Sequence, residues 1–84
     1  MDQDEVHISS MVVHARPDYL QDVKNNIKHL PGAEIHGESE CGKLVVVLES
    51  QTQTHITDVI AKIGDIEHVL STALVFHQIE QPDT

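Results

Sequence analysis

The sequence predicts an α+β domain in which two helices cover one face of a four-stranded antiparallel sheet. Two segments carry apolar residues at helical spacing, three others are rich in β-branched residues, and a short one at 33–38 lies between "LPG" and the turn "ESECG". These segments follow the order βαββαβ, and the two halves form a weak repeat in which Leu20 aligns with Ile56, Val23 with Val59 and Ile27 with Ile63. We expect one domain over residues 1–84, with flexible tails at 1–5 and 80–84.

The first half of the chain predicts a strand at residues 6–14 and a helix at 17–30. Pro17 and Asp18 suit the start of this helix, and Gln21 follows Asp18 at the spacing of a capping box. The helix has one apolar face, and "LPG" ends it. That face consists of Leu20, Val23, Ile27 and Leu30.

The second half repeats the pattern after a short strand at residues 33–38. The segment "ESECG" at 38–42 predicts a hairpin turn, and "KLVVVLE" at 43–49 predicts the next strand. A polar entry at 52–54 precedes a second helix with apolar residues from Ile56 to Ile63. The last strand is predicted at 68–79.

Two β-α-β halves of this kind predict a ferredoxin-like βαββαβ sandwich. Right-handed crossovers place both helices on the same face of the sheet, so the other face is left open to solvent. The expected spatial order of the strands is fourth, first, third, second.

The open face of this sheet is expected to be apolar in its centre. The repeat aligns Ile8, Ser10 and Val12 with Leu44, Val46 and Leu48, and we expect both sets to face the helices. An uncovered apolar patch usually marks a binding surface, although a dimer could cover it, and a register shift by one residue would exchange the two faces. The residues then expected on the open face are Met11, Val13, Val45, Val47, Leu74 and Phe76, with the acids Glu34, Glu38 and Glu49 along one side.

The composition is acidic, with 14 Asp and Glu against 5 Lys and Arg and a formal net charge of −9. This charge disfavours nucleic acids and anionic membranes as partners and favours a basic one. The single cysteine, Cys41, excludes an internal disulfide. The start "MDQDEVH" lacks the features of a secretory signal, and no apolar run is long enough to span a membrane, so we expect a cytoplasmic protein.

The sequence gives no support for catalytic, cofactor-binding or metal-binding residues, and we expect a non-enzyme. Seven histidines occur without an i, i+4 pair or a His-x-His, and Cys41 has no base partner at a known spacing. The loop "VHARPD" lacks the Cys-x-x-Cys of heavy-metal-binding domains, and Arg16 lacks the glycine-rich cradle of an acylphosphatase. The central strands also lack the aromatic residues of an RNA-recognition motif.

Three segments, "SSMVVHARP", "LPGAEIHGESECGKLVVVLES" and "IEHVLSTALVFHQIE", together resemble the NapD family over roughly residues 6–80. The resemblance implies a ferredoxin-like cytoplasmic chaperone for assembly of the periplasmic nitrate reductase. Such a chaperone binds the twin-arginine signal peptide of the catalytic subunit, NapA, and delays export until the molybdenum cofactor and iron–sulfur cluster are inserted. It is not an enzyme and carries no cofactor.

The resemblance also assigns roles to the open face. The apolar h-region of the signal peptide would rest on the six apolar residues named above, and its arginines would lie toward Glu34, Glu38 or Glu49. The protein would be a monomer or weak dimer without stable membrane association. A stand-alone small-molecule-sensing regulatory domain of the same fold remains an alternative function, and a metal-trafficking domain is a weaker one.

Overall fold

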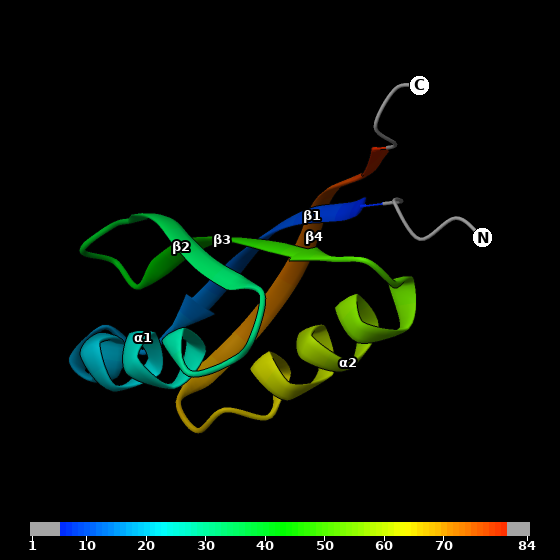
Figure 1. The fold of residues 1–84 in the computed structure, drawn as a ribbon. Coiled ribbons are helices and arrows are strands. Elements are labelled where there is room, and N and C mark those ends of the chain that lie inside the picture. The colour runs from blue at the N-terminus through cyan, green and yellow to red at the C-terminus, as the bar shows by residue number, and fades with distance from the viewer. Residues whose placement is uncertain (1–5, 81–84) are drawn as a thin grey trace.

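The computed structural model describes residues 6–80, so the expected tails at 1–5 and 81–84 lie outside it, as do the side chains of residues 76–80. The elements follow the predicted order, and both helices lie together on one side of the sheet (Figure 1). Residue 80, expected in the tail, belongs to the last strand. The bounds are β1 (Val6–Ala15), the 3-10 turn η1 (Pro17–Tyr19), α1 (Leu20–Lys28), β2 (Ala33–Glu38), β3 (Lys43–Ser50), α2 (Gln53–Gly64) and β4 (Val69–Glu80).

The sheet has the strand order β2-β3-β1-β4, and each neighbouring pair is antiparallel. This is the predicted order, so the ferredoxin-like α+β fold is confirmed. The two central strands, β3 and β1, therefore form the middle of any surface on the face away from the helices.

The two helices start in different ways. At the first, the expected capping box of Asp18 and Gln21 is wrong, because no side chain caps η1 or α1 and the chain enters through a 3-10 turn that begins at Pro17. At the second, Thr52 is the N-cap, and the backbone N–H of His55 donates to its Oγ1 at 3.1 Å.

The core lies between the helices and the inner face of the sheet. Apolar side chains of both layers are fully or almost fully buried there, and burial of a large one contributes roughly 1.5–3 kcal/mol. The helices contribute Val23, Ile27, Ile56, Val59 and Ile63, and the sheet contributes Met11, Val13, Ala15, Leu44, Val46 and Leu48.

The predicted placement of Met11 and Val13 on the open face is wrong. Their exposed fractions are 1% and 0%, and they pair with the inward-facing Val46 and Leu44 of β3. Both faces of β1 carry apolar residues, so hydrophobicity alone did not distinguish them. The alignment of the two helices did not carry over to the strands, because one residue separates β1 from Pro17, where the helical segment begins, whereas two residues separate β3 from Gln53 of α2. A difference of one residue exchanges the two faces of a strand.

Candidate functional site

The sheet face that points away from the helices is the candidate site, and we call it the open face. The register decides its membership, because directly paired residues of antiparallel strands lie on the same face. The side chains on it are exposed or partly exposed. They are Val6, Ile8, Ser10, Val12 and His14 of β1, Lys43, Val45, Val47 and Glu49 of β3, Glu34 of β2, and Ser71 and Ala73 of β4.

Apolar residues run across the centre of the open face. Val12 pairs directly with Val45, and Ser10 pairs with Val47. Val45 is 42% exposed, whereas its neighbours Val46 and Leu44 on the same strand are fully buried. We call Ile8, Val12, Val45 and Val47 the apolar strip, and it offers a partner hydrophobic contact area at the middle of the sheet.

A groove of ≈ 490 Å³ lies at one end of the open face, where β2 begins and β3 ends. Gly32 shapes this end: its φ of 82° suits glycine, and its carbonyl accepts a hydrogen bond of 2.9 Å from the backbone N–H of Glu49. The groove is therefore built from both apolar and acidic side chains. It is lined by Val6, Gly32, Ala33, Glu34, Val47, Glu49, Ser50 and Gln51.

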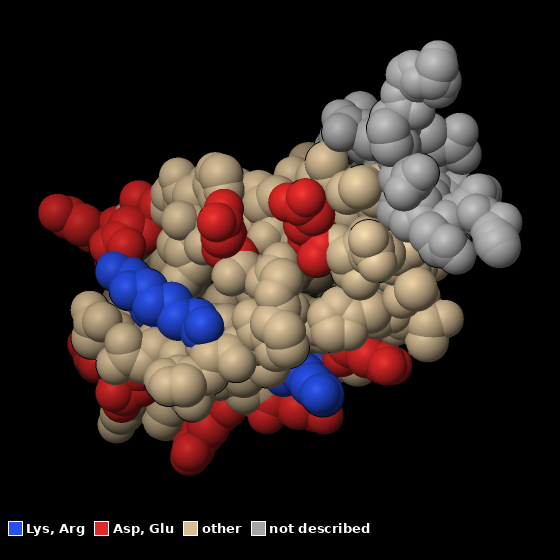
Figure 2. Space-filling view, in the orientation of Figure 1, with Lys and Arg blue, Asp and Glu red and all other residues tan. Residues whose placement is uncertain are grey.

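Two acids flank Val47 at this groove. Glu34 is paired with Val47 across the strands, and Glu49 lies two residues further along β3. Glu34 Oε1 lies 3.0 Å from His36 Nε2, and among the described residues Glu49 has no ion pair or side-chain hydrogen bond. Acidic side chains are prominent over β2 and β3 in Figure 2, where basic ones are few. Both predicted acids therefore keep carboxylates available to a cationic ligand.

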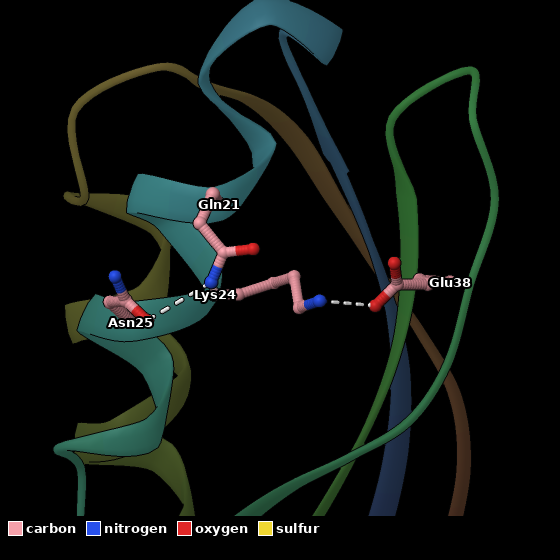
Figure 3. Close-up of polar contacts among 4 residues, drawn as sticks. All are labelled: Gln21, Lys24, Asn25 and Glu38. Carbon is pink, nitrogen blue, oxygen red and sulfur yellow. Dashed lines mark hydrogen bonds and ion pairs between the residues drawn. The ribbon is translucent and has the colours of Figure 1, made fainter.

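The predicted placement of Glu38 beside these acids is wrong. A bulge between Ile35 and Gly37 shifts the register of β2, so that Glu38 pairs with the inward-facing Leu44. Its carboxylate forms an ion pair with Nζ of Lys24 on α1 (Figure 3). The extra residue of the bulge thus turns Glu38 to the helix side, where its carboxylate is already paired with the ammonium of Lys24.

The last strand also differs from the prediction. Leu74 is 56% exposed, but it pairs with Met11 and so lies on the helix side of the sheet, because bulges in the β1–β4 pairing alter the expected alternation. Its placement on the open face is wrong. Phe76 pairs with Ser10, and its side chain lies outside the described part of the chain, so its role stays a prediction.

Of the predicted site residues, the structure brings together Val45, Val47, Glu34 and Glu49 on the open face. The prediction that Ile8 and Val12 face the helices is wrong, and the groove was not predicted. Ile8 and Val12 carried a usable signal, since they are β-branched residues of a central strand, but only the register assigns them a face.

Among residues 6–80, no group of three or more His, Cys, Asp or Glu could hold a metal ion. The helices of the same residues are too short or too polar to cross a membrane.

These features define a class of protein: a small ferredoxin-like binding domain whose open sheet face combines an apolar strip with an acidic groove. The family is settled by comparison with known proteins. The family model described as NapD protein matches residues 6–81, so the chain belongs to the NapD family.

Individual relatives agree with this assignment. The chain is 40% identical to a chaperone NapD from Paracoccus pantotrophus over 78 residues, which are 93% of this chain and 69% of that protein. It is 29% identical to the chaperone NapD of Escherichia coli K12, over 88% of this chain and 86% of that one. The solution structure of the E. coli Tat proofreading chaperone NapD superposes with a TM-score of 0.83 at 27% identity, covering 100% of this chain and 88% of the other.

A transcriptional regulator of the AsnC family from Pyrococcus furiosus shares the fold more distantly. Its TM-score is 0.64 at 17% identity, over 88% of this chain and 49% of the regulator. At this identity the similarity shows a common fold only.

Proposed function

We propose that this protein is a proofreading chaperone that binds the twin-arginine signal peptide of an exported enzyme on its open face. The relatives are named chaperones, and the solved structure of one is described as a Tat proofreading chaperone. The observation that carries the proposal is the apolar strip beside Glu34 and Glu49 on a sheet face that no helix of the described chain covers.

The chemistry of a signal peptide matches this surface. Such a peptide has a basic n-region followed by an apolar h-region. The apolar strip would take up the h-region, and the carboxylates of the groove would attract the arginines. The same face would thus recognise both parts of one ligand.

Typical free energies show whether the apolar strip or the acids contribute more to the affinity. Full burial of one large apolar side chain is worth roughly 1.5–3 kcal/mol, whereas an exposed ion pair contributes about 0–1 kcal/mol. A micromolar dissociation constant requires about 8 kcal/mol net, after the cost of ordering the peptide. The apolar strip therefore supplies most of the affinity, and the acids mainly guide approach and orientation.

The finer proposal concerns the client and the timing. We propose that the client is NapA, the catalytic subunit of the periplasmic nitrate reductase, and that bound chaperone hides the signal from the export machinery until the cofactors are in place. This role needs only reversible binding, so no catalytic group or cofactor is required of the chaperone. In this role the chaperone acts in the cytoplasm, where the signal peptide first emerges. It acts there as a single domain.

A matched pair of substitutions tests the proposal. Val45→Asp introduces a charge into the apolar strip and is expected to weaken binding of a synthetic signal peptide at least tenfold, about 1.4 kcal/mol or more. Leu74→Asp makes the same kind of change on the other face, at a residue that is 56% exposed, and should leave the affinity unchanged. Titration calorimetry gives both values. Equal affinities for the two variants would reject the open face as the binding site.

A further inference from the structure

Charge is distributed unevenly along the open face. Its acids, Glu34 and Glu49, lie at the groove, where β3 ends. At the opposite end of the same face, where β3 begins, Lys43 is paired with His14 of β1. All five Lys and Arg of the chain lie within the described residues, and none of them lines the groove. The groove end of the open face therefore has two carboxylates and no lysine or arginine in its lining, whereas the other end has Lys43, with the exposed Glu40 in the adjoining β2–β3 turn.

The acidic end is suited to an arginine side chain. Within residues 6–80, Glu49 has no ion pair, and the carboxylate of Glu34 has its one polar contact with the exposed His36. Val47 and Ala33 line the same groove, so the aliphatic stem of an arginine could pack on them while its guanidinium reaches the carboxylates. A guanidinium has five donors in a planar fork that matches carboxylates, whereas an ammonium is a compact point charge.

The distance along the face agrees with the length of an apolar h-region. Six residue steps separate Lys43 from Glu49, which at about 3.3 Å per step gives about 20 Å. A helical segment of about 13 residues covers this length at 1.5 Å per residue, and an extended segment of about 6 residues covers it at 3.3 Å per residue. The h-region of a signal peptide has about 7–15 residues.

We infer that the signal peptide binds in one fixed direction. Its arginines occupy the groove between Glu34 and Glu49, and its h-region runs over Val47 and Val45 toward Lys43 and the β2–β3 turn. The opposite direction would place the arginines beside Lys43 and leave both groove carboxylates without a cation. This inference rests on the proposed function, since it specifies the direction in which the open face binds the signal peptide.

The chain provides a natural probe for this direction. Cys41 is its only cysteine, is exposed, and lies in the β2–β3 turn next to the Lys43 end. A nitroxide spin label on Cys41 should broaden the NMR signals of an isotope-labelled signal peptide at the C-terminal end of its h-region. The matched variant Cys41→Ser/Gln53→Cys moves the label to the exposed first residue of α2, near the groove. That label should broaden the arginine signals instead.

The possible outcomes distinguish a wrong binding direction from a failure to bind the peptide at all. If the Cys41 label broadens the arginines, or if both labels broaden the peptide evenly, the fixed direction is overturned while binding itself stands. If the unlabelled chain does not bind the peptide in a parallel titration, the proposed function fails, and the direction fails with it.

Substitution of the acids tests the groove independently. Glu34→Gln and Glu49→Gln should each weaken peptide binding by up to about fivefold. Their effect should shrink for a peptide whose arginines are replaced by lysine. The matched control is Glu40→Gln, which removes an exposed acid from the β2–β3 turn at the other end. An equal loss for all three variants would show that only net charge matters and would overturn the arginine subsite.

Discussion

At the scale of single residues, the shape of the groove depends on Gly32. Its φ is 82°, and an added Cβ would lie 2.5 Å from the backbone oxygen of Glu49. The same residue accepts the hydrogen bond from the N–H of Glu49. A side chain at this position would therefore disturb both the turn before β2 and the placement of a groove carboxylate.

Gly32→Ala is expected to lower the free energy of unfolding by about 1–3 kcal/mol, because a non-glycine residue is strained at positive φ. Gly64→Ala is the control: a Cβ there meets nothing within 4 Å, and the residue ends α2. It should raise the stability by about 0.4–1 kcal/mol through the unfolded state. Urea denaturation measures both changes. A Gly32→Ala variant as stable as the parent chain would contradict the role given to this turn.

At the scale of elements, the register of β1 decides which residues are available to a ligand. Met11 and Val12 are adjacent and both apolar, yet Met11 is buried in the core and Val12 lies on the open face opposite Val45. A shift of one residue would exchange their roles.

This difference predicts opposite phenotypes for two neighbouring substitutions. Met11→Asp buries an uncompensated charge at a cost of about 3–5 kcal/mol, which is comparable to the whole stability of a domain this small, so the variant should be unfolded. Val12→Asp should remain folded and lose peptide affinity. Circular dichroism and calorimetry distinguish the two. A folded Met11→Asp variant with weakened binding would instead support the opposite register.

The elements also show how far the sequence alone could lead. Periodicity and turn signals predicted the described helices and strands, because each helix has one apolar face, three strands are rich in β-branched residues, and β2 lies between the turn segments "LPG" and "ESECG". It could not assign faces in β1, where both sides are apolar, or after the bulge of β2, where one extra residue turns Glu38 toward Lys24. On β3, where Leu44, Val46 and Leu48 are plainly the inner set, the predicted site residues Val45, Val47 and Glu49 were placed correctly.

At the scale of the whole molecule, the fold separates stability from recognition. Both helices pack on one face of the sheet and bury the core there, and no helix of residues 6–80 covers the other face (Figure 1). The net charge of −9 attracts a basic ligand to the protein. Two of the acidic residues, Glu34 and Glu49, lie together in the groove at one end of the open face. A partner with a basic start and an apolar continuation fits this arrangement.

The most direct test is an isotope-filtered NOE experiment on the chain bound to an unlabelled signal peptide. The methyl groups of Val12, Val45 and Val47 should show contacts with the apolar side chains of the h-region. The methyl groups of Leu74, exposed on the helix side of the sheet, should show none. Contacts from Leu74 or from the outer surfaces of α1 and α2, without contacts from the three valines, would contradict binding on the open face.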